Sequence, residues 1–209
     1  PLMIYGAEID DGKDDITIDN FTSLIDPLSW DEFMPRGVTK QKFNAFRKYY
    51  DGDVFAAAAK RIRNMLRSAD NLSIEQRIER ITQIFHTFRN PDKETVLTPW
   101  RVVNMHLSDT LGGYCFFDSD FDDKKPLADP RFVDRGKVTT EVFNPDTRIL
   151  EINSNSGLYP LYMAYSTYRA HIASLITSPD SIDDEWAVWQ KVVQENIFVI
   201  CKTPMAKSI

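Results

Sequence analysis

Two apolar segments in the C-terminal half restrict the possible folds of this chain more than any other feature. "RILEI" (148–152) and "NIFVIC" (196–201) are short runs rich in isoleucine, and helical patterns separate them. Such runs predict strands at 149–153 and 197–201, joined by a long helix from about residue 158 to 176 and a shorter amphipathic helix. Strands joined by a helical crossover pair in parallel. We therefore expect the opening unit of a doubly wound α/β sheet, with the long helix packed on one face.

A short polar loop, "NSNSG" (153–157), connects the first strand to the long helix. A tight turn there needs small side chains and residues that tolerate positive φ, and Asn155 and Gly157 meet both needs. A strand that ends in a carboxylate, here Glu151, above a glycine-containing loop is also the usual way to hold a nucleotide-like cofactor. The loop lacks the G-x-G-x-x-G spacing of dinucleotide-binding proteins, which disfavours a dehydrogenase. A plain turn and a cofactor loop both remain open.

A self-contained helix is predicted in "TPWRVVNMHLSDTLGG" (98–113). Thr98 is the expected N-cap, Pro99 suits the first helical position, and Gly112 and Gly113 end the helix. The next stretch, "YCFFDSDFDDKKPLADPRF", is rich in Asp, Lys and Pro and is predicted to be a loop. Its Asp residues lack the glycine and the terminal glutamate of a calcium loop, so no calcium site is predicted.

The N-terminal segment, residues 1–37, contains two short strand patterns, in "PLMIYGAEID" and in "DITI". It is predicted to be a linker or the edge of a preceding domain. The chain starts within a strand pattern, without an initiator Met, and it stops shortly after "NIFVIC". We therefore expect a fragment of a larger protein.

The following segment, residues 38–92, predicts three helices that form a bundle. Thr39 and Asp53 are the expected N-caps of the first two helices. Ser73 and Gln76 match a capping box at the start of the third.

Composition limits the classes of function. The net charge of −6 disfavours nucleic-acid binding over the whole surface, although the basic stretch from Lys40 to Arg89 is either a DNA face or the solvated side of amphipathic helices. No stretch approaches the roughly 20 apolar residues of a membrane helix, and the N-terminus lacks a signal pattern. We expect a cytoplasmic protein with no membrane association. Cys115 and Cys201 match no metal spacing and are predicted to be reduced thiols in the core.

Two motifs, in order and spacing, resemble a known enzyme family. "TPWRVVNMHL" and "ILEINSNSG" are similar to the first two motifs of the amino-methyltransferases of restriction-modification systems, which use S-adenosylmethionine to methylate adenine in DNA. In that family a "TPxxVVxxM" helix precedes a strand ending in "LDPACGSG", and residues 150–157 fall on those eight positions without a gap. Three further segments resemble the sequences of large single-polypeptide bacterial restriction enzymes, in which a helicase-like region precedes the methylase: "GVTKQKF", "NPDKETVLTPWRVVNMH" and "FNPDTRILEINSNSGLYPLY".

The resemblance implies a fold and a domain order. The implied fold is α/β, an N-terminal helical segment followed by the opening part of an incomplete Rossmann-like S-adenosylmethionine-dependent methyltransferase sheet. Residues 38–92 would be a helical coupler between motor and methylase, and residues 93–209 the N-terminal portion of the methyltransferase domain. DNA would be the partner of the larger enzyme. The alternative is a structural or interaction module of a restriction or helicase protein that binds no cofactor.

The resemblance also implies which residues hold the cofactor: Thr98, Pro99, Glu151, Asn153, Ser156 and Gly157. The hydroxyl of Thr98 and the helix N-terminus at Pro99 would lie against the methionine carboxylate. Glu151 would meet the ammonium group, directly or through water. The loop residues would wrap the methionine portion.

Two positions depart from the family pattern, and one motif is missing. Asn155 replaces the first loop glycine, and Cys201 replaces the acidic residue that would hold the ribose hydroxyls. No "NPPY"-like loop, which in the family binds the target adenine, occurs in the sequence, and "FNPDTR" precedes the first strand instead of following the fourth. No catalytic residue is therefore predicted. We expect weak or undetectable S-adenosylmethionine binding and no methyl transfer by this chain alone.

Overall fold

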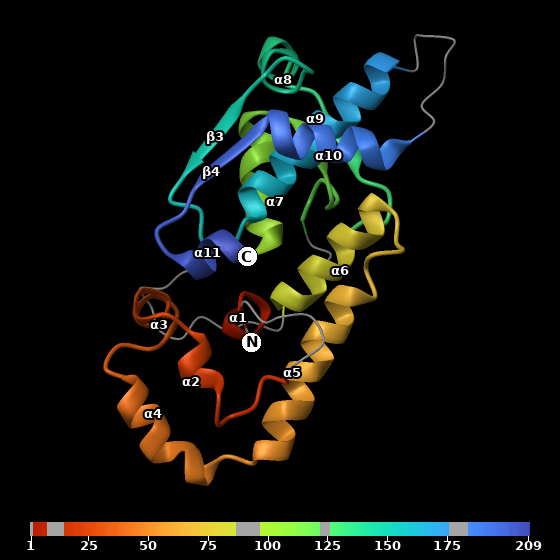
Figure 1. Ribbon diagram of the computed structural model, residues 1–209. Helices are drawn as coiled ribbons and strands as arrows, with labels where there is room; N and C mark the ends of the chain where they lie inside the picture. The colour runs from red at the N-terminus through yellow and green to blue at the C-terminus, as the bar shows by residue number, and fades with distance from the viewer. Residues whose placement is uncertain (1, 8–14, 87–96, 122–125, 176–183) are drawn as a thin grey trace.

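The computed structural model describes residues 2–7, 15–86, 97–121, 126–175 and 184–209 (Figure 1). Within these ranges the fold is mixed α/β, with two sheets of two strands each. The strands are β1 (Gly113–Cys115), β2 (Arg131–Val133), β3 (Ile149–Ile152) and β4 (Ile197–Ile200). The helices are α1 (Leu2–Tyr5), α2 (Phe21–Leu24), α3 (Pro27–Phe33), α4 (Lys40–Phe46), the 3-10 helix η1 (Arg47–Tyr49), α5 (Gly52–Arg67), α6 (Ile74–His86), α7 (Trp100–Thr110), α8 (Lys137–Val142), α9 (Leu158–Leu175), α10 (Glu185–Glu195) and α11 (Pro204–Ser208).

Strands β3 and β4 pair in parallel, as the sequence predicts. Ile149 lies opposite Ile197 and Ile152 opposite Ile200. Helices α9 and α10 form the crossover between the strands, and α9 packs against both of them (Figure 1). The predicted parallel pair and its covering helix are therefore confirmed. A larger Rossmann-like sheet stays a prediction.

The opposite face of the β3–β4 pair is apolar and exposed. Leu150 and Phe198 face each other in the register and are 56% and 44% exposed, and Ile152 and Ile200 are 71% and 54% exposed. Parallel strands in α/β proteins are normally covered on both faces and are therefore apolar on both. The apolar residues on the exposed face of β3 and β4 are therefore typical of strands that are covered on both faces.

The segment after α7 was predicted to be a loop, and this is wrong at its two ends. β1 and β2 form an antiparallel pair in which the Tyr114 and Phe132 rings lie 5.2 Å apart. Contacts distant in sequence hold these three-residue strands: the Tyr114 backbone N–H donates to Ser166 Oγ at 2.9 Å, and Arg131 Nε donates to the Phe117 carbonyl at 2.7 Å. Neither contact has a local sequence signal.

The predicted N-terminal strands are also wrong. Leu2–Tyr5 is helical, and residues 15–18 form no strand. The side chains of α1, α2 and α3 instead enter a core that includes Ala59 of α5 and Met205 of α11. The N-terminal segment thus shares a core with residues far along the chain.

The helical segment agrees with the sequence at two of its three predicted caps. Thr39 caps α4, and Ser73 and Gln76 form the capping box of α6, each backbone N–H donating to the other side chain at 3.2 and 3.3 Å. Asp53 is not the N-cap of α5, because Asp51, two residues earlier, accepts from the N–H groups of residues 53 and 54.

The predicted three-helix bundle is wrong as well. Helices α5 and α6 pack on each other. Helix α4 lies apart from them, and its Phe43 ring packs at 5.6 Å from Phe21 and 5.5 Å from Trp30 (Figure 1). Helix α4 therefore packs on the aromatic residues of α2 and α3.

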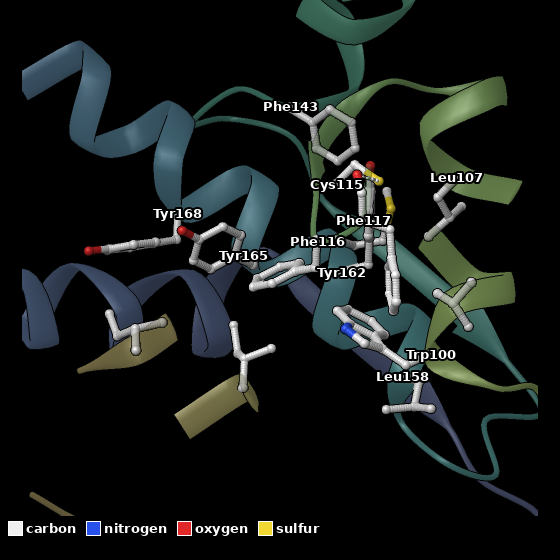
Figure 2. Packing of buried hydrophobic residues seen from close by; sticks show 14 of the residues in the cluster. Trp100, Leu107, Cys115, Phe116, Phe117, Phe143, Leu158, Tyr162, Tyr165 and Tyr168 are labelled. Carbon is white, nitrogen blue, oxygen red and sulfur yellow. Dashed lines mark hydrogen bonds between the residues drawn. The ribbon is translucent and has the colours of Figure 1, made fainter. Parts of the chain in front are cut away.

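An aromatic core fixes α7 against α9 (Figure 2). Trp100 and Tyr162 are both fully buried, and their rings lie 6.3 Å apart. The Tyr162 hydroxyl donates to the Gly112 carbonyl at 2.7 Å, which ties α9 to the end of α7. Gly112 has a φ of 78° just after the helix, as the sequence predicts for a glycine that ends it.

Candidate functional site

The carboxyl ends of β3 and β4 bring Glu151 and Cys201 together. Glu151 is half-buried, and its Oε2 atom is buried without a hydrogen-bond partner. Burial raises the pKa of Glu151 above its ordinary value, and a hydrogen bond with the Ser154 side chain lowers it in part. Burial also raises the pKa of the Cys201 thiol, and the Glu151 charge raises it further, which places the two groups within electrostatic reach. A carboxylate oxygen without a donor is suited to a cationic ligand.

The loop after β3 turns at two left-handed residues. Asn153 has a φ of 66° and Gly157 a φ of 69°. The prediction that Asn155 takes the left-handed conformation is wrong, because Asn153, two residues earlier, takes it instead. The backbone N–H of the next residue, Ser154, donates to the Ile200 carbonyl at 3.0 Å. That bond continues the β3–β4 pairing by one residue and fixes the backbone before Asn155.

The remaining loop positions differ in exposure. Asn153 is exposed, whereas Ser156 and Gly157 are half-buried. A Cβ added at Gly157 would meet nothing within 4 Å, so the glycine borders open space. The side-chain oxygen of Asn155, Oδ1, is buried and has no hydrogen-bond partner. The loop therefore holds a second buried acceptor close in sequence to Glu151.

Thr98 is not the N-cap of α7. The helix begins at Trp100, and Pro99 is the N-cap, whose carbonyl accepts from the N–H groups of Val102 and Val103 at 2.9 and 3.1 Å. Because proline has no side-chain acceptor, the first N–H groups of α7 lack a side-chain cap. Thr98 is half-buried and Pro99 is exposed.

The two predicted walls of the site adjoin the same core. Trp100 follows Pro99 directly, Leu158 follows Gly157 directly, and both residues belong to the core of Figure 2. The structure thus anchors both segments through their buried neighbours. Direct contact of Thr98 or Pro99 with the loop stays a prediction.

Three surface hollows occur elsewhere, and none of these three includes a predicted cofactor residue. One of about 540 Å³ lies beside α7 and β2 and includes His106, whose Nδ1 is 3.1 Å from the Tyr159 hydroxyl. Phe121, on its wall, has a φ of 55°, which is unusual for a bulky residue. No sequence motif predicts this hollow, because its residues come from separate segments of the chain. The second lies on α5 and α6, and the third, of about 230 Å³, lies between α3 and α4.

The sequence also makes predictions about metal binding, membrane helices and the two cysteines. In the part of the chain that the structure describes, no cluster of three potential metal-ligating side chains occurs. Across the same ranges, no helix combines the length and apolarity that a bilayer crossing requires. Cys115 is a buried free thiol, and Cys201 is a half-buried one.

Comparisons with protein-family models, with curated proteins and with solved structures gave no match for this chain.

A change of Glu151 to Gln is expected to stabilise the protein in the absence of any ligand at pH 7. The folded-state pKa lies above the ordinary value of 4.5, so the folded protein holds this proton more firmly than the unfolded chain. Stability from Glu151 is therefore full below pH 4.5 and is lost as the pH rises through the folded-state pKa. Glutamine, which mimics the protonated form, should raise the melting temperature at pH 7 and lose this advantage towards pH 4. A melting temperature of Glu151→Gln below that of wild type at pH 7 would mean that the charged carboxylate stabilises the turn after β3.

Proposed function

We propose that this chain contributes the S-adenosylmethionine-binding part of an adenine-specific DNA methyltransferase in a restriction-modification enzyme. The observation that carries the proposal is Glu151, a carboxylate with a buried, unpartnered oxygen at the carboxyl end of a parallel strand. Ligands of open α/β sheets bind at this end of the strands. A cytoplasmic location accompanies this proposal, since bacterial DNA lies there.

The residues at the methionine end fit the cofactor. Glu151 would accept from the ammonium group, which supplies the donor that its Oε2 lacks. The open space at Gly157 leaves room for the ligand to approach the backbone, and the uncapped N-terminus of α7 would attract the carboxylate. The bound cofactor would supply an electrophilic methyl group. The exposed apolar face of β3 and β4 further supports membership in a larger sheet.

The ribose end fits less well. Cys201 follows β4, where a carboxylate would hold the ribose hydroxyls, and a thiol is a weak hydrogen-bond partner. A charge-assisted hydrogen bond contributes about 1.5 to 3 kcal/mol, so its absence weakens binding by roughly ten- to a hundredfold. We therefore propose weak binding, and no methyl transfer without a loop that holds the target adenine.

A thermal-shift titration with S-adenosylmethionine tests this function. At about ten times the dissociation constant the ligand stabilises by about 1.4 kcal/mol, which raises the melting temperature by about 3 to 6 °C for a domain of this size. The wild-type protein should show this rise at millimolar ligand, and Glu151→Gln should not, relative to its own ligand-free value. Glu141→Gln, a change to an exposed carboxylate paired with Lys137 on α8, should behave as wild type. Equal rises for wild type and Glu151→Gln would contradict the role of Glu151 in binding, and no rise for either protein would favour the structural module, which binds no cofactor.

A further inference from the structure

One face of α5, together with Arg80 of α6, forms a cationic surface hollow of about 530 Å³. Its lining consists of Ala57, Lys60, Arg61, Asn64, Met65, Ser68 and Arg80. The α5 residues recur at helical spacing, so they lie on one side of the helix. Three of the seven side chains carry a positive charge and none carries a negative one. The hollow is therefore a concentrated positive site on a protein whose net charge is −6.

Within the described residues, the cations of this hollow have no carboxylate partner. From Val54 to Ala69 the sequence contains no Asp or Glu. Elsewhere in the described ranges, Arg47, Arg135, Lys137 and Arg169 each lie within 4 Å of a carboxylate. Lys60 and Arg61 make no ion pair among the residues that the structure places. Unneutralised cations gathered around a hollow favour an anionic ligand.

One of the cations is already held in place. Arg80 Nη1 donates to Ser68 Oγ at 3.0 Å, across the gap between α6 and α5. This bond uses a neutral hydroxyl, so the guanidinium keeps its full charge and its other donors. Asn64 and Ser68 add neutral polar groups to the lining. Such a combination of guanidinium, ammonium, amide and hydroxyl groups is typical of contacts with phosphate oxygens.

The dimensions favour several phosphates over one. The lining extends along α5 from Ala57 to Ser68, which is about 16 Å at 1.5 Å per residue. Aromatic residues directly before α5 favour a nucleic acid over a free polyphosphate: Phe46, Tyr49 and Tyr50 are 57%, 72% and 58% exposed, and Lys48 Nζ lies 5.0 Å from the centre of the Tyr49 ring. Exposed rings beside cations stack on unpaired bases.

We propose that this hollow binds the phosphate backbone of a nucleic-acid strand through Lys60, Arg61 and Arg80. The inference goes beyond the cofactor site and does not need it, because nucleic-acid binding is measured without S-adenosylmethionine. Failure of either proposal would leave the other standing.

Fluorescence anisotropy with the full chain and a labelled single-stranded DNA of about 20 nucleotides tests the inference. Binding should weaken with salt, with a slope of log K against log salt near −2 for three phosphate contacts at about −0.7 each. The double variant Lys60→Glu with Arg61→Glu should bind at least about tenfold more weakly and with a slope smaller in magnitude by about 1.4. If that variant does not fold, as judged by circular dichroism, Arg80→Gln gives the same test with a slope reduced by about 0.7.

The matched control is Lys137→Glu with Lys207→Glu, which changes the net charge equally at two exposed sites outside the hollow. This control variant should bind the oligonucleotide with an affinity within about twofold of wild type, because the contacts in the hollow are unchanged. Equal weakening by both double variants would overturn the proposal, because net charge alone would then explain binding. No binding to the oligonucleotide at about 50 mM salt would also overturn it. Inorganic tripolyphosphate that binds as tightly as the oligonucleotide would assign the hollow to free polyphosphates instead.

Discussion

Replacing Trp100 by alanine is expected to lower the free energy of unfolding by about 3 to 5 kcal/mol. Trp100 is 1% exposed, and its ring lies 5.4 Å from Phe116 and 6.3 Å from Tyr162 (Figure 2). The substitution removes the largest side chain between α7 and α9 and leaves a cavity in a core that cannot fully close around it. Urea unfolding followed by far-UV circular dichroism measures the loss, since this signal does not depend on tryptophan.

Two further variants separate packing from chemistry at this position. Trp100→Phe should cost clearly less than Trp100→Ala, because the Trp100 Nε1–H is buried without an acceptor and its removal relieves that penalty. Trp186→Ala is the control: this ring is 38% exposed and has Arg77 at 4.0 Å from its centre, so its loss should cost about 1 kcal/mol or less. Similar costs for Trp100→Ala and Trp186→Ala would contradict the assigned core.

Replacing Cys201 by aspartate is expected to tighten S-adenosylmethionine binding by roughly ten- to a hundredfold. Cys201 directly follows β4, beside Glu151, and an aspartate there would accept hydrogen bonds from the ribose hydroxyls. The Glu151 charge opposes a second carboxylate, because it already raises the pKa of the thiol. The ammonium group of the ligand would offset this repulsion in the complex. Isothermal titration calorimetry measures the change in affinity.

Cys201→Asn is the matched control for this gain. It has the shape of aspartate without the charge, so it should improve affinity by less than about threefold, as a neutral hydrogen bond contributes only about 0.5 to 1.5 kcal/mol at best. Methionine, which lacks the ribose, should bind both variants no more tightly than wild type. Equal affinities of the aspartate and asparagine variants for S-adenosylmethionine would contradict a ribose site at Cys201.

The parts of the fold that the sequence predicted correctly have local signals. β3 and β4 are four-residue strands rich in isoleucine, and helices separate them in the sequence, which is the usual connection of a parallel pair. The capping box of Ser73 and Gln76 lies within four residues, so its pattern is visible in the sequence. In each case the residues that make the interaction are those that form the motif.

The parts that the sequence missed depend on distant contacts. Leu2–Tyr5 is too short for periodicity to separate helix from strand, and the core of α5 and α11 decides its conformation. β1 relies on Ser166, more than fifty residues away. The left-handed turn falls on Asn153 because the Ser154 N–H is bonded to Ile200, a partner on another strand.

The central claim, that the loop after β3 holds S-adenosylmethionine, is tested most directly by a nuclear magnetic resonance titration. Amide spectra of the 15N-labelled chain detect weak binding and show where it occurs. We predict that the ligand shifts the amide signals of residues 151–157 and of the first turn of α7, and that Glu151→Gln abolishes these shifts. Unchanged signals in both segments at millimolar ligand, or shifts confined to other parts of the chain, would contradict the account.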